Sequence, residues 1–263
     1  MMNYQTIELQ RDDHCATVWL NRPDVRNAFD DAMIAELTQA FTLLGNDPQV
    51  RVIVLAARGS VFCAGADLHW MKAMAGYNEA ENRADAARLA QMLQAIYACS
   101  KPVIAKVQGD CYGGGVGLVA ACDIAVAADA VQFCLSEVKI GLIPATIAPY
   151  VVRAMGARAA HRYVLTAERF SAQQAHAFGF AHEVVHLAGL DAKIDEIVKA
   201  LLAASPHALR EAKRLLQDVA GAELNETLIA DTVERIAAIR SSEEGREGVQ
   251  AFLEKRKPGW LQD

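Results

Sequence analysis

The feature of this sequence most suggestive of chemistry is a run of glycines in GDCYGGGVGL (109–118). Gly113, Gly114, Gly115 and Gly117 fill four of five consecutive positions, although a glycine inside a helix costs about 1 kcal/mol. A glycine-rich turn that enters a helix presents free backbone N–H groups and the positive end of the helix dipole. The run therefore predicts a site for an anion, either a phosphate or an oxyanion that develops during a reaction.

A second stretch, GSVFCAGADL (59–68), follows RVIVLAA (51–57), which has the pattern of a buried strand. The small residues at 64–66 would let a ligand approach the backbone closely. Asp67 is of a type that caps the first turn of a helix. Without a ligand the same residues describe a tight strand-to-helix turn, so this stretch alone leaves both interpretations open.

A third stretch, FCLSEVKIGLIP (133–144), places Glu137 just past a short candidate strand and among apolar residues. Such a carboxylate is either an exposed surface group or a catalytic acid/base whose pKa is raised by burial. Taken alone, the pattern favours the surface group.

The elements that must position these stretches alternate between strand-like and helix-like patterns over the first half of the chain. Two amphipathic segments with helical spacing, 30–45 and 80–100, separate short runs rich in Val and Ile. Strands separated by helices predict an α/β fold with parallel crossovers. The candidate strands are YQTIELQ (4–10) and CATVWLN (15–21), expected to form a hairpin, with RVIVLAA (51–57), KPVIAKVQG (101–109), DIAVAAD (123–129) and QFCL (132–135).

From about residue 157 onward the pattern becomes almost wholly helical. Pro206 at the start of one helix, and Gly156, Gly179 and Gly221 between helices, mark the boundaries. We predict a β/α core over residues 1–200 and a C-terminal helical region over 201–263 that serves oligomerisation.

Composition excludes several classes of protein. The formal net charge of −6 argues against nucleic-acid binding, which requires a basic face to neutralise phosphates. The six cysteines form no CxxC pair and no His/Cys cluster with zinc spacing, so we expect no metal site and reduced thiols in a cytoplasmic protein. The sequence has neither the pattern of a secretory signal nor an apolar run near the ~18 residues of a membrane span, so no membrane partner is expected.

Taken together, these motifs resemble the enoyl-CoA hydratase/isomerase family, also called the crotonase family. The resemblance covers nearly the whole chain and implies a crotonase-like ββα spiral core with a C-terminal helical block. The segments that carry it are LNRPDVRNAF (20–29), FCAGADL (62–68), GGGVGL (113–118), CDIAVA (122–127), SEVKIGLIP (136–144), TAERFSAQQAHAFGF (166–180) and FLEKRKPGW (252–260).

The resemblance also implies a catalytic site. The family acts on acyl-CoA thioesters and stabilises an enolate at the thioester oxygen with two backbone N–H groups. By position these groups belong to Ala66 and Gly114, and losing one such donor costs on the order of 3 kcal/mol of barrier. Glu137 matches the carboxylate that protonates the α-carbon in the family's hydratases.

Further residues match the family's coenzyme contacts. Those that line the adenine and pantetheine groove are Arg26, Ala64, Asp67 and Leu68. Phe252 and Lys255 match C-terminal contacts that reach the coenzyme of a neighbouring subunit. The resemblance implies no cofactor besides the coenzyme A of the substrate, and assembly as a homotrimer or hexamer.

The sequence departs from the family pattern at two places. The usual hydratase has a second glutamate, which activates water, at the position that Gly117 holds here. The glycine-rich run that normally follows Pro144 is replaced by ATIAPYV (145–151). Asp110 is the nearest acidic residue that could substitute, although a turn carboxylate capping the glycine helix is the favoured role for it. Weaker candidates are Tyr112, Cys111 and His69.

A variant with GGGVGLVAACD and SEVKIGL resembles the methylglutaconyl-CoA hydratases of leucine and terpenoid breakdown. We therefore expect hydration of a 2,3-enoyl-CoA, with branched or carboxylated acyl groups among the candidates. Lys72, Lys139 and Arg153 could each pair with a distal carboxylate, although surface charges are the simpler interpretation. The alternatives are a Δ3–Δ2 enoyl-CoA isomerase that uses Glu137 alone and a non-catalytic relative that binds coenzyme A or RNA.

Overall fold

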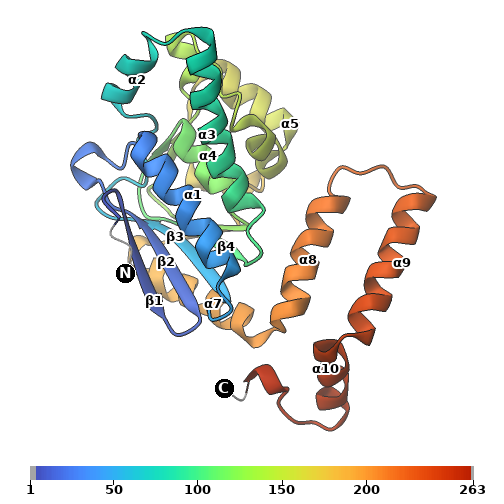
Figure 1. Ribbon diagram of the computed structural model, residues 1–263. Helices are drawn as coiled ribbons and strands as arrows, with labels where there is room; N and C mark the ends of the chain where they lie inside the picture. Colours follow the sequence, from blue (N-terminus) through green and yellow to red (C-terminus); the bar gives the residue numbers. More distant parts are fainter. Residues whose placement is uncertain (1–3, 262–263) are drawn as a thin grey trace.

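The structure, a computed structural model, describes residues 4–261, in which a β/α core carries an arm of three helices (Figure 1). The main sheet has six strands in the order β1-β2-β3-β4-β6-β9. β1 and β2 form the predicted hairpin, and every later neighbour joins in parallel, which confirms the predicted α/β fold. The strands are β1 (Ile7–Asp12), β2 (Cys15–Leu20), β3 (Val52–Ala57), β4 (Val103–Val107), β6 (Ile124–Ala128) and β9 (Glu183–Val185).

A second, three-stranded sheet has the order β5-β7-β8 and lies directly before two of the candidate chemical stretches. Its strands are β5 (Cys111–Tyr112), β7 (Gln132–Cys134) and β8 (Arg169–Ser171). β5 leads into the glycine run, and β7 leads to Glu137. Because β5 and β7 pair in parallel, both stretches leave the sheet from the same edge.

The helices of the core cover the main sheet on both faces. α1 and α3 pack on one face over buried residues such as Leu37, Phe41 and Leu93, while Leu190 and Ile194 of α7 pack on the other. Asp30 caps α1 through the N–H of Met33. The helices are α1 (Asp31–Asn46), α2 (Leu68–Met74), α3 (Glu79–Tyr97), α4 (Gly114–Ala120), α5 (Ala148–Thr166), α6 (Ala172–Ala177) and α7 (Leu190–Ala203).

The second half of the chain is less purely helical than the sequence predicted. β8 and β9 lie within it, and each has only three residues, too few to show a period-two pattern. The predicted helix boundaries are confirmed. Gly156, with φ +76°, interrupts α5, Gly179 and Gly221 also have positive φ, and Pro206 begins a helix.

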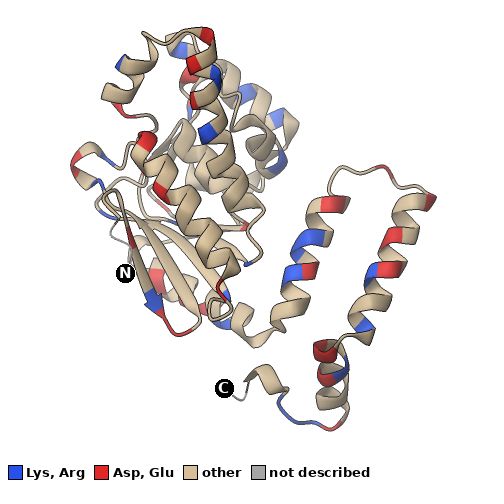
Figure 2. Cartoon of the chain, viewed as in Figure 1, with Lys and Arg blue, Asp and Glu red and all other residues tan. Residues whose placement is uncertain are grey.

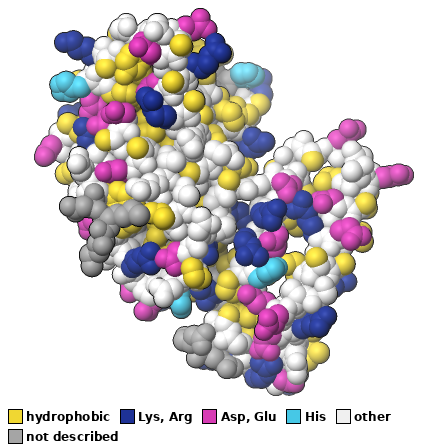
Figure 3. Space-filling model, viewed as in Figure 1, with side chains coloured by type: hydrophobic (Ala, Val, Ile, Leu, Met, Phe, Trp, Pro, Cys, Tyr) yellow, Lys and Arg dark blue, Asp and Glu magenta, His cyan; other side chains and the backbone are white. Residues whose placement is uncertain are grey.

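The arm consists of α8 (Pro206–Val219), α9 (Glu226–Ser241) and α10 (Glu243–Leu253), and it stands off the core (Figures 1 and 3). The predicted boundary at residue 200 falls inside α7, which ends at Ala203. Both signs of charge lie along α8 and α9 (Figure 2), where Arg235 pairs with Asp218 and Asp231 at 2.7 Å. None of the helices between residues 4 and 261 has the length and apolar character needed to cross a membrane.

Candidate active site

The glycine run forms the turn from β5 into α4. Gly113, with φ +51°, donates its N–H to Cys134 O at 2.8 Å, so the N–H of Gly114 is the first of α4 to lack a backbone partner within residues 4–261. A Cβ atom on Gly114 would lie 2.7 Å from Phe29 Cε1, and one on Gly115 would lie 2.8 Å from Cys63 Cβ. Glycine is therefore required here by close packing under a helix N-terminus.

Ala66 lies on a short extended segment beside Phe29. Phe29 donates its N–H to Gly65 O at 2.9 Å and accepts from Asp67 N at 3.0 Å, which makes a parallel bridge between Phe29 and Ala66. Because N–H groups alternate in direction along an extended chain, the N–H of Ala66 points away from Phe29. In the described part of the chain it donates no hydrogen bond.

The two segments with free N–H groups adjoin each other. Tyr112 donates its N–H to Cys63 O at 2.9 Å, and a Cβ on Gly65 would lie 3.2 Å from Tyr112 O. The structure therefore brings Ala66 and Gly114, both predicted from the sequence, onto neighbouring pieces of backbone. Two free donors on adjoining segments are the arrangement that an oxyanion hole needs.

Glu137 begins a short 3-10 helix (Glu137–Ile140) directly after β7. Its backbone is anchored by a hydrogen bond from Leu142 N to its carbonyl oxygen at 3.1 Å. Its carboxylate lies against the glycine turn, because a Cβ on Gly113 would be 3.4 Å from Glu137 Oε1. The carboxyl group therefore lies one residue from the free N–H of Gly114.

Glu137 is half-buried, and one of its two carboxyl oxygens is removed from water. Its Oε2 is buried and has no hydrogen-bond partner among residues 4–261. Burial raises the pKa of Glu137, and a hydrogen bond from its own backbone N–H only partly opposes this. A carboxyl group in this setting holds its proton to higher pH than an exposed one, which suits a general acid.

Gly117 contacts the segment that replaces the family's glycine-rich run. A Cβ on Gly117 would lie 2.7 Å from Ile147 Cβ and closer still to its Cγ2. Ile147 is only 2% exposed and stands at the N-terminus of α5. The two departures from the family pattern, Gly117 and the segment 145–151, therefore contact each other, and Ile147 fills the space beside Gly117.

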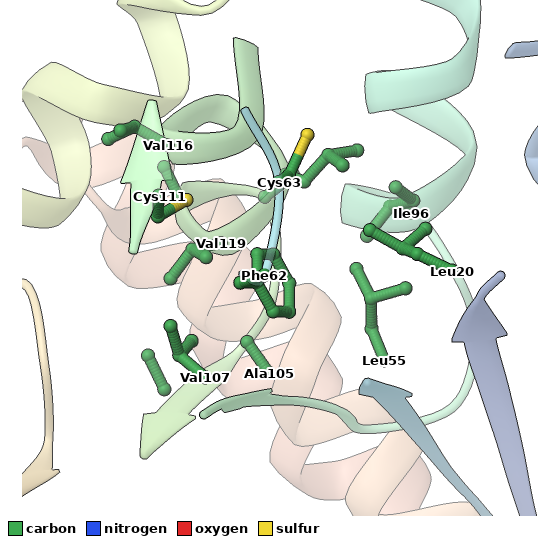
Figure 4. Packing of buried hydrophobic residues seen from close by; sticks show 14 of the residues in the cluster. Leu20, Leu55, Phe62, Cys63, Ile96, Ala105, Val107, Cys111, Val116 and Val119 are labelled. Carbon is green, nitrogen blue, oxygen red and sulfur yellow. The ribbon is translucent and has the colours of Figure 1, made fainter. Parts of the chain in front are cut away.

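The side chains of the weaker candidates have other partners or surroundings. Asp110 accepts hydrogen bonds from Gln132 N at 2.9 Å and from the Tyr112 hydroxyl at 3.1 Å, so it joins β5 to β7 instead of capping the glycine helix as predicted. Cys111 lies among apolar side chains (Figure 4), and burial raises the pKa of its thiol. The imidazole of His69 is almost fully exposed.

The predicted coenzyme residues fall into two groups. Arg26 and Ala64 are joined by a hydrogen bond from Ala64 N to Arg26 O at 3.0 Å, and Leu68 is 80% exposed nearby at the start of α2. Phe252 and Lys255 are exposed at the end of α10, at the far end of the molecule from α2 and α4 (Figure 1). Their predicted contact with a neighbouring subunit's coenzyme stays a prediction.

The carboxylate of Asp67 is occupied inside the protein. It accepts hydrogen bonds from His69 N and Trp70 N, which confirms the predicted helix cap, and from Arg22 Nη2 at 3.1 Å. Burial alone would raise the pKa of Asp67, but these hydrogen bonds and the charge of Arg22 outweigh it and lower the pKa. A coenzyme contact at this position would therefore have to use the backbone.

Two residues of the site were not singled out from the sequence. Phe29 stands within the family-like segment LNRPDVRNAF, and Ile147 within the segment that departs from the family. Their roles depend on contacts with glycines far away in the chain, which no local pattern signals. In the described range 4–261, no group of three or more His, Cys, Asp or Glu side chains is placed to hold a metal ion.

Comparison with known proteins agrees with this geometry. The sequence model of the enoyl-CoA hydratase/isomerase family matches residues 10–263. A crystal structure of an enoyl-CoA hydratase from Shewanella pealeana superposes with a TM-score of 0.95 at 43% identity, covering 98% of this chain and 96% of that one. This likeness confirms the predicted crotonase-like fold.

Curated relatives lead to the same family. An enoyl-CoA hydratase of Thermus thermophilus, whose assignment is itself provisional, is 33% identical over 93% of this chain and 96% of its own. The mevalonyl-coenzyme A hydratase of Aspergillus fumigatus is 35% identical over 94% of this chain and 91% of its own. The chain therefore belongs to the enoyl-CoA hydratase/isomerase family of enzymes.

Proposed function

We propose that this enzyme hydrates a 2,3-enoyl-CoA thioester to a 3-hydroxyacyl-CoA through an oxyanion-stabilised enolate. The observation that carries the proposal is the position of the Glu137 carboxyl group, buried and unpartnered at Oε2 and packed on Gly113 beside the free N–H of Gly114. A proton donor next to an oxyanion hole is what α-protonation of an enolate requires.

In the proposed reaction, the N–H groups of Ala66 and Gly114 donate to the thioester oxygen. Water attacks C3, the electron pair of the C2–C3 double bond moves toward the thioester, and negative charge develops on its oxygen. Glu137 then delivers its proton to C2, and the proton that leaves the water restores the carboxyl group. The net change is the addition of one water molecule across the double bond.

Residue 117 takes no part in moving these protons. Glycine has no side chain to act as a base, and Ile147 fills the adjoining space with an apolar group. Water activation therefore differs from that of a hydratase with two glutamates, and the pocket is rebuilt beside the acyl group. This supports an acyl group other than a simple straight chain.

The acyl group we propose is branched or carboxylated, as in methylglutaconyl-CoA. The motif resemblance to methylglutaconyl-CoA hydratases supports it, and a relative named mevalonyl-coenzyme A hydratase is consistent with it. Lys72, Lys139 and Arg153 are all exposed, so their positions favour surface charges over a buried partner for a distal carboxylate.

Product analysis tests the proposal directly. The enzyme is incubated with crotonyl-CoA, methylglutaconyl-CoA and a 3-enoyl-CoA, and the products are separated by liquid chromatography with mass detection. Hydration adds the mass of water and gives a 3-hydroxyacyl-CoA. If the 2,3-enoyl substrates return unchanged while the 3-enoyl-CoA is converted to its 2-enoyl isomer, the enzyme is not a hydratase.

The second candidate function is Δ3–Δ2 isomerisation, which Gly117 favours. One carboxyl group suffices to move a proton between C2 and C4, and Glu137 would be that group. A non-catalytic role is less well supported, because burying an unpartnered carboxyl oxygen costs stability and has no evident use in a protein that only binds.

A further inference from the structure

The two free N–H groups of the site belong to segments that must be held at a fixed separation. Oxyanion donors act at about 2.7–3.1 Å from the oxygen, and a misplacement of about 1 Å can cost on the order of 100-fold in rate. On one side the segments touch directly, through the hydrogen bond from Tyr112 N to Cys63 O. On the other side a buried aromatic side chain reaches from the segment paired with Ala66 to Gly114.

That side chain is Phe29, which is 2% exposed. Its backbone holds both neighbours of Ala66, through Gly65 O and Asp67 N, at 2.9 and 3.0 Å. The tip of its ring rests on Gly114, where even a Cβ atom would overlap it. One residue therefore touches the supports of both donors.

The ring of Phe29 packs against a tryptophan that is itself fixed by a hydrogen bond. Trp70 packs on Phe29 with ring centroids 5.7 Å apart, and its indole N–H donates to the buried carboxylate of Asp85 at 3.3 Å. On the backbone side, Arg22 donates to Ala28 O at 2.5 Å and to Asp67 Oδ2 at 3.1 Å, which links the Phe29 segment to the Ala66 segment. Contacts on the ring and on the backbone thus both fix the position of Phe29, so its ring cannot shift easily away from Gly114.

We propose that Phe29 is a positioning residue of the oxyanion hole, whose ring sets the distance between the N–H groups of Ala66 and Gly114. The inference rests on the proposed function only in that both place the thioester oxygen at these two groups. A shorter side chain at position 29 would let α4 move toward the extended segment. A longer one would push α4 away, because the para position of the ring already faces Gly114.

The kinetic test compares Phe29→Leu and Phe29→Tyr with Phe41→Leu, which shortens a phenylalanine of similar burial in α1. Both Phe29 variants are expected to lose about 10–100-fold in kcat with KM within about 3-fold, since substrate binding is spread over the whole coenzyme. Phe41→Leu is expected to lower the melting temperature similarly and to keep kcat. The proposal is overturned if Phe29→Leu keeps kcat while losing the same stability.

A second test uses the reciprocal contact. Gly114→Ala should be severely impaired, because its new methyl group collides with the Phe29 ring. The double variant Phe29→Leu/Gly114→Ala gives that methyl group room and should recover part of the lost kcat. A double variant no better than Gly114→Ala alone would contradict a spacer role.

A spectroscopic measurement separates this proposal from the proposed function. Crotonyl-CoA is bound to Glu137→Gln, with and without Phe29→Leu, and the infrared band of its thioester carbonyl is recorded. We expect the band to lie below that of free crotonyl-CoA in Glu137→Gln and to shift back toward it when Phe29 is shortened. If the band lies at the same position in Glu137→Gln with and without Phe29→Leu, Phe29 does not position the donors. If the wild-type enzyme forms no hydroxyacyl product, only the proposed hydration is refuted.

Discussion

At the scale of single residues, Glu137 is the group on which the proposed chemistry depends. We predict that Glu137→Gln lowers kcat by at least ~100-fold, because a general acid contributes roughly 10²–10⁴-fold and the amide cannot supply the proton. Binding should persist, because the amide is nearly isosteric. Steady-state hydration of crotonyl-CoA, with calorimetry for binding, measures both. Asp110→Asn is the control, because its remaining oxygen can still accept from Gln132 N.

The outcome for Asp110→Asn decides a second question. Unchanged kinetics would leave Asp110 as the link between β5 and β7 that the structure shows. Loss of hydration with intact folding would make it the base that activates water. A Glu137→Gln variant with most of its activity would remove Glu137 from the mechanism.

Burial of Glu137 also predicts a pH dependence. Since burial raises the pKa of Glu137 in the folded protein, the folded state binds the proton more tightly than the unfolded state does. The resulting stability is present below the ordinary pKa of a glutamic acid and is lost as pH rises through the raised value. Glu137→Gln, which stays neutral, should therefore be more stable than wild type at neutral pH. Urea denaturation of both proteins at pH 7 measures this, and a less stable variant would contradict it.

Gly117 and Ile147 form the other pair that can be tested at this scale. Gly117→Glu should lower activity on the native substrate, because the new side chain meets Ile147 and would bring a second carboxylate near Glu137. Gly117→Glu/Ile147→Gly restores the space and should hydrate crotonyl-CoA faster than Gly117→Glu alone. If Gly117→Glu by itself turns over the native substrate faster than wild type, the pocket does not differ from that of a hydratase with two glutamates in the way we propose.

At the scale of secondary structure, an ion pair between a buried lysine and a half-buried aspartate joins the arm to the core. Lys213 of α8 donates to Asp123 Oδ2 at 2.7 Å and to Lys101 O at 3.0 Å. We predict that Lys213→Met lowers the free energy of unfolding by about 1–3 kcal/mol, because the half-buried Asp123 carboxylate then keeps only the hydrogen bond from Val103 N. It should also expose the α7–α8 connection to proteolysis.

Urea denaturation and limited trypsin digestion measure this effect. The control is Lys193→Met on α7, whose partner Glu196 is exposed and whose loss should leave the unfolding midpoint unchanged. Equal stability of the Lys213→Met and Lys193→Met variants would show that the ion pair does not hold the arm.

The elements that the sequence predicted best are the long helices and the segment with a strongly biased composition. α1 and α3 are long enough for the 3.6-residue period to appear, and composition alone marked the glycine run as the turn that begins α4. β8 and β9 are too short to carry a period. The contacts of Phe29 with Gly114 and of Ile147 with Gly117 join distant parts of the chain, so they became visible only when the chain was folded.

At the scale of the whole molecule, the arm presents an apolar face that the residues from 4 to 261 leave exposed. Ile229, Val233 and Ile236 follow helical spacing on α9, are each about half exposed, and belong to a helix with no buried residue. We predict a homotrimer or hexamer that covers this face. Light scattering at micromolar concentration should show it, and Val233→Glu should dissociate it while Glu234→Gln does not. A particle of 28.4 kDa would contradict the prediction.

Assembly should also complete the active site. We predict that Phe252 and Lys255, exposed at the end of the arm and far from α4 of their own chain, contact the coenzyme of an adjacent subunit. Glu137→Gln subunits are inactive in this view, and Phe252→Ala/Lys255→Ala subunits have a raised KM. Mixed oligomers of the two should regain part of the low-KM activity, because an intact arm of one subunit serves the intact Glu137 of the other.

The control for this complementation mixes Phe252→Ala/Lys255→Ala subunits with subunits that carry Glu137→Gln, Phe252→Ala and Lys255→Ala together. No intact arm is then present, so the low-KM activity should not return. If both mixtures keep the KM of the Phe252→Ala/Lys255→Ala enzyme, the arm does not reach a neighbour's coenzyme. Because the arm stands off its own core, the apolar stripe of α9 would then be its remaining contribution to assembly.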